Sequence, residues 1–280
     1  MNSNKELLDS GYTRFSAPAK LNLFLKVINK RKDGYHNIQS VFQLIDLQDD
    51  IFIKLRNKDN QITIKNSSLL IKPEHDLAFK AAELMLIDRQ LGADIIINKE
   101  IPIGAGLGGG SSNAATVIMA INKLGKFNLS KINLMKYGLK LGADIPFFIN
   151  GVNAWVEGVG ELLYDIKITN STYVVMVPNL SINTKKIFEG FKLTNSLIPL
   201  KIAHSYNAVK HDFVRNDLEE TVIKKYVKMA ELLKWMSCFG NAKMSGTGSS
   251  IFLRTKNLST AKSIEKNKPR NTDCFIVKGL

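Results

Sequence analysis

A run of glycines in the first half of the chain is the segment best suited to chemistry. Five of the seven residues 104–110 are glycine, and Ser111, Ser112 and Asn113 follow before an apolar helical pattern begins. Such flexibility is favoured where backbone must approach a ligand closely. Successive N–H groups followed by the positive end of a helix dipole bind phosphate. The segment predicts a phosphate-binding loop whose helix is capped by one of these three polar residues, with a plain glycine-rich turn as the alternative.

The loop does not fit the common nucleotide-binding patterns. Gly104, Gly106 and Gly109 satisfy G-x-G-x-x-G, but a dinucleotide fold also needs an acidic residue about 20 positions later to bind the ribose. Residues 101–143 contain no Asp or Glu, and the sequence contains neither H-R-D nor D-F-G of protein kinases. The P-loop pattern fails because serines follow Gly110 where its lysine would stand. We therefore expect a nucleotide or polyphosphate loop of another lineage.

Asp144 is the first carboxylate after Glu100, and it stands before the sequence Ile-Pro-Phe-Phe. An aspartate at this place could simply cap the next helix. Near a phosphate loop it could also orient an acceptor hydroxyl and take its proton during phosphoryl transfer. Since a carboxyl of pKa about 3.9 is a weak base toward an alcohol, positioning and charge stabilisation would carry most of the rate. A partner lysine would hold its orientation.

Strands and helices must position these residues, and the sequence predicts both. Residues 20–27 alternate with period two, which places Lys20 and Asn22 on one face of a strand and apolar residues on the other. Further strands of a mostly antiparallel array are expected over residues 38–47, 51–55, 61–65 and 93–98. Helices are expected over residues 77–90 with Asp76 as N-cap, 114–124, 131–141, 218–236 and 259–266, and a last strand over 273–277. The C-terminal half thus reads as a layered α+β arrangement.

The composition is that of a folded protein. The chain has 280 residues, of which 45% are hydrophobic and 23% charged. Cys238 and Cys274 form no disulfide framework, and no Cys/His cluster has metal-site spacing, so no metal ligand is predicted. Residues 1–10 lack the apolar core of a signal peptide, and no apolar run reaches the length of a membrane span. We expect a cytoplasmic, soluble protein with no membrane partner.

The net charge of +14 raises the question of a nucleic-acid partner. The densest basic clusters are residues 30–32 and the set Lys266, Lys268 and Arg270, without an arginine-rich arm or interleaved aromatic residues. We therefore expect no nucleic acid, and favour either a solvated lysine surface or a field that gathers a small anionic substrate. A basic nucleic-acid-binding module remains the alternative from a different class, and in that case Lys20 and Asp144 would be dispensable.

Three segments carry a family resemblance. Residues 18–23 (Pro-Ala-Lys-Leu-Asn-Leu), the glycine loop over 102–112 and residues 244–250 (Met-Ser-Gly-Thr-Gly-Ser-Ser) resemble, in order and spacing, the three motifs of the GHMP kinases. Asp-Gly-Tyr-His at 33–36 and Leu-Gly-Ala-Asp-Ile-Pro at 141–146 resemble the branch of that family that phosphorylates 4-(cytidine 5′-diphospho)-2-C-methyl-D-erythritol, in the non-mevalonate isoprenoid pathway. The match is sparse between residues 161 and 241.

The resemblance implies an α+β fold of the two-domain α/β GHMP kinase type. Residues 1–160 would form a ribosomal-protein-S5-like, ATP-binding N-terminal domain, and residues 161–280 a ferredoxin-like C-terminal GHMP kinase domain, with the active site between them. It implies a small-molecule kinase that uses ATP with Mg²⁺ on the 2-hydroxyl of that cytidine-linked alcohol, as a monomer or weak homodimer. Family members that act on homoserine or mevalonate are the nearest alternative, but those substrates have no base to bind.

The resemblance also assigns roles to individual residues. It makes Lys20 and Asp144 a catalytic pair. It places acceptor binding on Asn22 and holds the cytosine by Tyr35, His36 and Phe188, through stacking and hydrogen bonding. Structural roles for Asn22 and Phe188 remain open alternatives. It assigns ATP binding to the glycine loop, its upstream lysine and the third motif: Lys99, Pro102, Ile103, Gly104, Ala105, Gly106, Leu107, Gly108, Gly109, Gly110, Ser111, Ser112, Gly246, Thr247 and Gly248.

Overall fold

The computed structural model describes residues 2–57, 59–67, 72–193 and 215–280, with side chains from residue 4 onward. These residues form two compact units that alternate along the chain. Unit 1 comprises residues 1–19, 48–101 and 108–151, and unit 2 comprises residues 20–47, 102–107 and 152–280. The division of the sequence into domains at residue 160 remains a prediction.

Unit 1 contains part of a β-sheet, formed by the second half of β2 (His36–Asn57) with β4 (Leu91–Asn98) and β3 (Ile62–Asn66). The second half of β2 pairs antiparallel with β4, which pairs in parallel with β3. Ile51 and Ile53 of β2 and Ile95 and Ile97 of β4 are buried, as expected for strands with one covered face. This parallel pair of β4 and β3 departs from the otherwise antiparallel pairing of the strands named here, whereas the sequence predicts a mostly antiparallel array.

The strand β2 is longer than predicted, because residues 38–47 and 51–55 belong to one strand rather than two. The polar residues between them look like a turn in the sequence, yet both carboxylates have partners within unit 1. Asp49 forms an ion pair with Lys99, and Asp50 forms one with Arg14 at 2.7 Å. Because these charges are paired, the strand continues through them without a break.

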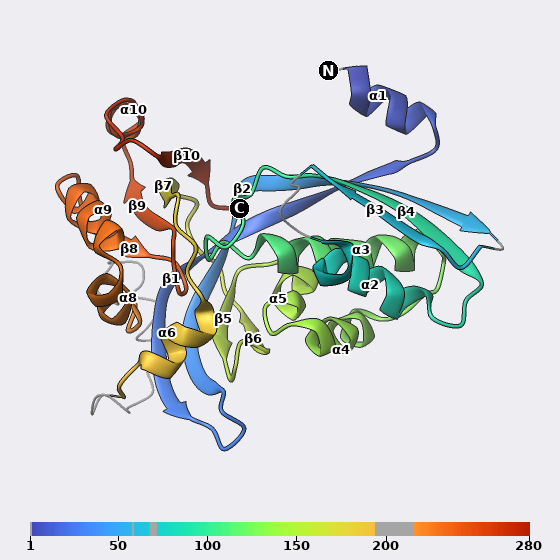
Figure 1. Cartoon of the computed structure of the whole chain (residues 1–280), viewed down its shortest axis with the longest axis horizontal. Helices are drawn as coiled ribbons and strands as arrows, with labels where there is room; N and C mark the ends of the chain where they lie inside the picture. Colours follow the sequence, from blue (N-terminus) through green and yellow to red (C-terminus); the bar gives the residue numbers. More distant parts are fainter. Residues whose placement is uncertain (1, 58, 68–71, 194–214) are drawn as a thin grey trace. The chain divides into compact units, whose positions relative to one another are not determined.

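Four helices of unit 1 lie together on one face of these strands (Figure 1): α2 (Leu77–Leu86), α3 (Gly109–Leu124), α4 (Lys131–Leu141) and α5 (Ile145–Asn150). The predicted cap of α2 is confirmed, since the Asp76 carboxylate accepts a hydrogen bond from the Ala78 N–H at 2.8 Å. α2 ends earlier than predicted because Asp88 and Gln90 have φ values of 60° and 50°, which no right-handed helix contains. Unit 1 also contains the helix α1 (Asn2–Asp9) and the short 3-10 helix η1 (Pro73–His75).

The first strand, β1 (Thr13–Lys30), contains the predicted strand and extends beyond it at both ends. Its predicted apolar face is buried, as expected. The opposite face is buried as well, since Lys20 and Asn22 are only 4% and 2% exposed. An ammonium and an amide are seldom buried without a partner or a function, so this face of β1 is where a site is expected.

Unit 2 contains a four-stranded antiparallel sheet in the order β10-β7-β9-β8. Its strands are β7 (Thr172–Pro178), β8 (Ala242–Met244), β9 (Ile251–Thr255) and β10 (Thr272–Lys278), which confirms the predicted last strand. One face of the sheet shares an apolar core with helices α8 (Glu219–Lys225), α9 (Val227–Ser237) and α10 (Leu258–Lys266). The predicted helix over 218–236 is two helices, because Tyr226 adopts an extended conformation between them.

The rest of unit 2 supports the first half of β2. Residues 40–42 of this strand pair antiparallel with β5 (Ala154–Glu157), which pairs with β6 (Leu162–Asp165). The short helix α6 (Thr184–Gly190) adds Ile187 to the apolar core. These elements therefore support β2, which begins at His36, one of the residues predicted to hold the cytosine.

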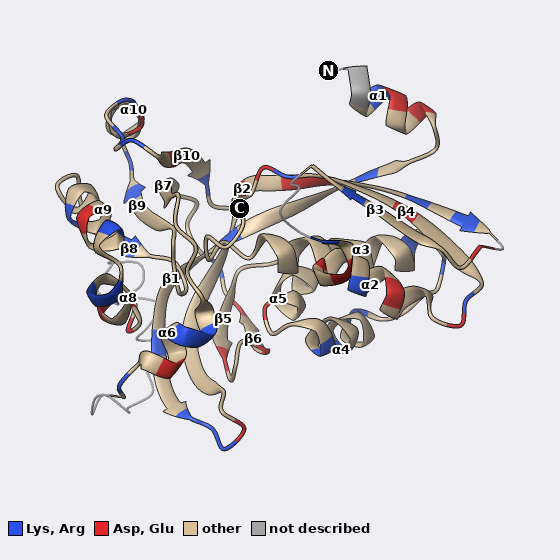
Figure 2. Ribbon diagram, viewed as in Figure 1, with Lys and Arg blue, Asp and Glu red and all other residues tan. Residues whose placement is uncertain are grey.

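The charged residues are distributed over both units. Figure 2 shows Lys and Arg on the loop between β1 and β2 and on α4, α6, α8 and α9. Within the described part of the chain, no helix is both long and apolar enough to cross a membrane.

Candidate phosphate-binding and catalytic site

The helix behind the glycine loop begins at Gly109, before the three residues predicted to cap it. Gly108 is the N-cap, with a φ of 73°, and it has no side chain to accept hydrogen bonds from the first turn. The prediction that Ser111, Ser112 or Asn113 caps the helix was therefore wrong. Glycine reaches the left-handed conformation without steric cost and starts the helix without a side-chain cap. The first turn of α3 thus receives no hydrogen bond from an N-cap side chain, and anion binding by its N–H groups remains a prediction.

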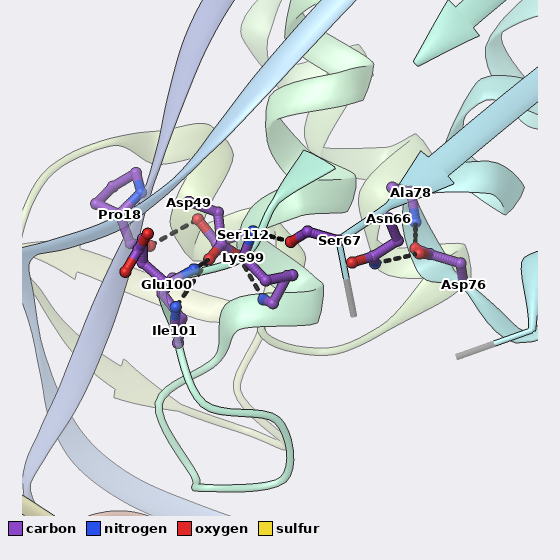
Figure 3. A network of polar contacts seen from close by, with 10 residues as sticks. All are labelled: Pro18, Asp49, Asn66, Ser67, Asp76, Ala78, Lys99, Glu100, Ile101 and Ser112. Carbon is purple, nitrogen blue, oxygen red and sulfur yellow. Dashed lines mark hydrogen bonds and ion pairs between the residues drawn. The ribbon is translucent and has the colours of Figure 1, made fainter. Parts of the chain in front are cut away.

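A buried carboxylate fixes the chain just before the glycine loop (Figure 3). Asp49 is fully buried, and its Oδ1 accepts hydrogen bonds from the N–H groups of Glu100 at 2.8 Å and Ile101 at 2.9 Å. Its Oδ2 binds the Lys99 ammonium, while the Lys99 N–H donates to Ser67 Oγ at 2.8 Å. The chain therefore leaves β4 in a fixed direction as it enters the loop.

The same ion pair positions Lys99, a predicted ATP contact. A Cβ atom built on Gly109 would lie 3.1 Å from Lys99 Nζ, so the ammonium is held beside the first residue of α3. The Asp49 carboxylate offsets the charge of this ammonium, so the ion pair places a cationic donor group near the helix N-terminus without a full net charge. The contact of Lys99 with a nucleotide remains a prediction, which its position beside the start of α3 supports.

Unit 1 also joins the first motif to the helix of the second. The buried Ser112 hydroxyl donates a hydrogen bond to the Pro18 carbonyl at 2.6 Å. This hydrogen bond joins β1 to the start of α3. A phosphate-binding or ion-binding role for Ser112 and for the half-buried Ser111 stays a prediction.

In unit 2, residues of all three motifs are joined by hydrogen bonds. The Lys20 N–H donates to Leu107 O at 3.0 Å, the Ser250 N–H to Ala105 O at 2.9 Å, Ser245 Oγ to Gly106 O at 3.3 Å, and the Asn22 N–H to Ser245 Oγ at 3.0 Å. In the sequence, the first motif (18–23) and the third motif (244–250) are more than 200 residues apart. The contacts show that the first half of the glycine loop lies between the first and third motifs.

The side chains of Lys20 and Asn22 are buried side by side. Lys20 Nζ donates a hydrogen bond to Asn22 Oδ1 and lies 4.5 Å from the centroid of the Phe42 ring. Asn22 Nδ2 donates to Ser40 Oγ at 3.2 Å. A buried ammonium is tolerated only where acceptors and an aromatic face replace its water. Asn22 therefore has a structural role, holding Lys20 in place, and its contact with an acceptor remains a prediction.

Asp144 occupies the N-cap position of α5 in unit 1 and is half-buried. Its carboxylate makes no capping hydrogen bond to that helix. One reason is Pro146 at the second helical position, which has no N–H to donate. The capping role that the sequence left open is therefore not the role of this carboxylate. Lys20 belongs to unit 2 and Asp144 to unit 1, so the pairing of the two remains a prediction.

The third motif packs tightly on the glycine loop. A Cβ atom on Gly106 would lie 2.6 Å from Ser245 O and 2.8 Å from Gly248 O. Thr247 is buried, and its hydroxyl shares a hydrogen bond of 2.9 Å with that of Thr184 at the start of α6. The structure thus brings the third-motif backbone directly against the loop, as a phosphate site formed by both would require.

Tyr35 and His36 end a tight turn between β1 and β2. The Arg31 N–H donates to Tyr35 O at 2.7 Å, and Asp33 Oδ1 accepts from the Tyr35 N–H at 3.1 Å. The Tyr35 side chain is 65% exposed, whereas that of His36 is 8% exposed. The turn therefore presents one aromatic ring to solvent and holds the other against the protein.

His36 stacks on Phe188, with ring centroids 5.2 Å apart and planes 27° from parallel. Phe188 lies on α6 and is half-buried at the edge of the core, while its neighbour Ile187 fills the core itself. The structure thus brings together two of the three aromatic residues predicted to hold a base. Burial, followed by the nearby Lys30 cation, lowers the pKa of His36 below its ordinary value of 6.5.

Sequence reasoning missed two residues that order the site, Asp49 and Ser245. Ser245 stands inside the third motif, but the family resemblance assigns roles only to Gly246, Thr247 and Gly248 of that motif. Asp49 looked like part of a break between strands; an acidic residue flanked by long apolar stretches was the available signal. Among the described residues, no group of three or more His, Cys, Asp or Glu side chains is arranged to hold a metal ion.

Two family models match the chain. The model described as GHMP kinases N terminal domain matches residues 76–152, and the one described as GHMP kinases C terminal matches residues 203–267. The matches lie on the glycine loop with Asp144, and on the third motif.

Named relatives match nearly the whole chain. The 4-diphosphocytidyl-2-C-methyl-D-erythritol kinase of Paraburkholderia xenovorans (strain LB400) is 40% identical over 272 residues, covering 94% of this chain and 92% of the relative. The kinase of that name from Thiobacillus denitrificans (strain ATCC 25259 / T1) is 40% identical over 268 residues, 95% of each. A crystal structure of 4-(cytidine 5′-diphospho)-2C-methyl-D-erythritol kinase superposes with a TM-score of 0.82 at 28% identity, covering 95% of this chain and 99% of the other.

Proposed function

The chain belongs to the GHMP kinase family, and from that membership we propose that it transfers the γ-phosphate of ATP to the 2-hydroxyl of 4-(cytidine 5′-diphospho)-2-C-methyl-D-erythritol. The products are ADP and the 2-phosphate, and the reaction belongs to the non-mevalonate isoprenoid pathway. The observation that carries the proposal is 40% identity over 94% of the chain to a kinase of that name. The predicted two-domain α+β GHMP kinase fold is confirmed by the family models and the matching crystal structure.

ATP would bind at the glycine loop. The first-turn N–H groups of α3, behind Gly108, would supply donors for the phosphates, and the Lys99 ammonium lies beside Gly109 as a further donor. The third-motif backbone at Gly246, Thr247 and Gly248 would complete the site, supported by its packing on Gly106. Mg²⁺ would enter with ATP as part of the co-substrate, where it bridges and neutralises phosphate oxygens. We assign it no protein ligand.

Phosphoryl transfer would depend on Asp144 and Lys20. The acceptor oxygen forms a bond to the γ-phosphorus while the bond from that phosphorus to the β,γ-bridging oxygen breaks, and ADP leaves with the electron pair. The Asp144 carboxylate orients the acceptor hydroxyl and accepts its proton. Lys20, held by Asn22 and the Phe42 ring, would pair with Asp144 and fix its direction.

The acceptor would lie near the turn between β1 and β2. A cytosine is a flat ring with donors and acceptors on its edge, so it suits an aromatic face together with a neutral imidazole. Tyr35, His36 and Phe188 supply these groups, and Asn22 would contact the sugar-alcohol part. We further propose a cytoplasmic protein, monomeric or weakly dimeric, with no nucleic-acid or membrane partner.

The direct test is to incubate the purified protein with Mg-ATP and each candidate alcohol in turn, and to measure ADP and phosphorylated product. We expect turnover with the cytidine-linked methylerythritol and none with homoserine or mevalonate. Turnover with one of the latter would keep the kinase and reject the cytidine pocket. If no alcohol is phosphorylated, salt-dependent binding to nucleic acid becomes the next hypothesis to measure.

Tyr35→Ala should raise the KM for the cytidine-linked acceptor about tenfold, because stacking on one base is worth about 1–3 kcal/mol. The melting temperature, kcat and the KM for ATP should stay near wild type, since the side chain is largely exposed. Tyr164→Ala on β6 is the matched control, because it removes another exposed tyrosine of unit 2. An unchanged acceptor KM in Tyr35→Ala would show that the base lies elsewhere.

The acceptor KM should also depend on the charge of His36. With its pKa lowered by burial and by Lys30, His36 is neutral at pH 7 and can accept a hydrogen bond. The acceptor KM should be flat above pH 6.5 and rise as the pH falls through the lowered pKa. Protein stability should fall over the same range, because protonation is easier in the unfolded chain, whose His36 titrates at its ordinary pKa of 6.5.

Lys30→Met provides the control for this pH dependence. Removing the cation near His36 should raise the pKa of the imidazole and move the rise in acceptor KM to higher pH. His36→Gln should abolish the rise. A pH profile of the acceptor KM that is the same in all three proteins would exclude His36 from acceptor binding.

A further inference from the structure

A polar segment at the start of α8 holds the backbone around the third motif. Asn216 is 4% exposed, and both hydrogens of its amide are donated to main-chain carbonyls, Met244 O at 2.9 Å and Gly246 O at 2.6 Å. Glu219 Oε2 accepts from the Met244 N–H at 3.0 Å. Nothing in the sequence motifs marks these residues, which stand about 25 positions before the loop they bind.

The same segment is tied to β1, the strand of the first motif. The Asp217 N–H donates to Leu25 O at 2.8 Å, and Asp217 Oδ2 accepts from the Val27 N–H at 2.9 Å. Leu25 and Asn216 also form an isolated parallel bridge. The segment 216–219 therefore connects the strand of Lys20 and Asn22 to the third-motif loop, all within unit 2.

The Asn216 contact sets the direction of one peptide group in the loop. A trans peptide is planar with its C=O and N–H on opposite sides, so fixing Gly246 C=O fixes the Thr247 N–H to point away from Asn216. Gly246 has a φ of 58°, and a Cβ there would lie 3.2 Å from Asn22 Oδ1. The hydrogen bond from Asn216 thus sets the orientation of this peptide, and a side chain at position 246 would meet Asn22.

We propose that Asn216 is a positioning residue for nucleotide binding, which holds the peptide 246–247 in the orientation that receives the ATP phosphates. Glu219 is the second anchor, at the start of the same loop. The inference rests on the proposed function, because it takes the third motif as part of the ATP site. It adds two residues that act through the loop backbone and touch neither substrate.

The test is Asn216→Asp, which keeps the shape of the side chain and places a carboxylate against two carbonyls. Binding of a non-hydrolysable ATP analogue with Mg²⁺ should weaken about tenfold or more, as expected when a buried hydrogen bond is lost. The KM for ATP should rise by the same factor, while kcat at saturating ATP changes less. Asn257→Asp is the matched control, because the side-chain oxygen of Asn257 accepts hydrogen bonds as the N-cap of α10, and a carboxylate keeps that role.

Acidification provides a readout that a general loss of structure would not give. Protonating the introduced carboxyl restores one donor, so the ratio of variant to wild-type ATP affinity should recover as the pH falls from 8 toward 6, since burial raises a carboxyl pKa by several units. Its own segment carries Arg215, Asp217 and Glu219, and the cations that act on these neighbouring carboxylates are Lys26 on β1 and Lys243 on β8. These are the same in both proteins, so the ratio isolates the introduced group.

Asn216→Ser keeps the test decisive if the aspartate variant does not fold. Its hydroxyl can replace the Asn216 oxygen that accepts from the Leu218 N–H, while both amide donors are lost. ATP affinity equal to wild type in either folded variant would overturn the inference. A wild-type protein that binds no ATP analogue would instead contradict the proposed function, so the two failures are distinguishable.

Discussion

Asp144→Asn should lower kcat by about 10²–10⁴-fold, the range typical of a lost general base, while ATP affinity and the melting temperature stay close to wild type. Asn keeps the shape of the side chain and its ability to accept a hydrogen bond from the acceptor hydroxyl. It has neither the charge to stabilise the transferred proton nor the basicity to accept it. The change therefore removes the chemistry and leaves the position.

Stability should survive because the Asp144 carboxylate does not cap α5. Asp76 shows the contrast, since its carboxylate accepts from the Ala78 N–H at the start of α2. Losing such a cap lowers the free energy of unfolding by about 0.5–2 kcal/mol. A normal melting temperature in Asp144→Asn, together with slow turnover, would separate a catalytic carboxylate from a structural one.

Asp88→Asn is the charge-matched control for this experiment. Asp88 is exposed in unit 1, and its φ of 60° suits asparagine as well as aspartate. Both variants change the net charge by the same amount, so a general effect of charge on the polyanionic substrates would appear in both. Turnover near wild type in Asp144→Asn would remove this residue from the mechanism.

Much of the fold could be predicted because its patterns are local. The alternation in residues 20–27, the cap at Asp76 and the helix over 131–141 each depend on neighbours in sequence. The errors arose where distant partners decide the outcome. Asp49 and Asp50 continue β2 instead of ending it, because Lys99 and Arg14 pair with them across the unit.

The candidate site divides in the same way. The glycine loop could be identified from composition, since few other functions need so many glycines together. Its cap could not, because Gly108 rather than a polar residue starts α3. The supports of the site could not be predicted either, because Ser245 and Asn216 act through hydrogen bonds between segments 223 and 30 positions apart.

Gly106→Ala should impair ATP binding more than any other single change in the loop. The alanine Cβ would lie 2.6 Å from Ser245 O and 2.8 Å from Gly248 O, and both obstacles are backbone atoms that cannot rotate away. The residue also has a φ of 75°, where a side chain adds about 1–2 kcal/mol of strain. We expect the KM for ATP to rise by roughly a hundredfold, since displacing buried backbone contacts removes about 3 kcal/mol.

Gly104→Ala separates the two causes. Gly104 has nearly the same φ, 70°, but its Cβ would meet nothing within 4 Å. Both variants should therefore lose about 1–2 kcal/mol of stability from backbone strain, measured by denaturant unfolding. The excess loss of ATP affinity in Gly106→Ala then measures the contact between loop and third motif. Equal ATP affinities in the two variants would mean that this contact does not shape the phosphate site.

The KM for the acceptor alcohol should also rise in Gly106→Ala, because the displaced residue Ser245 contacts both the glycine loop and Asn22. Ser245 Oγ accepts from the Asn22 N–H at 3.0 Å, and Asn22 holds the Lys20 ammonium. Moving Ser245 therefore disturbs the residues proposed to orient Asp144 and contact the acceptor. A rise in both KM values with a fall in kcat would show that the three motifs act as one site, whereas a change in the ATP KM alone would show that the loop serves the nucleotide independently.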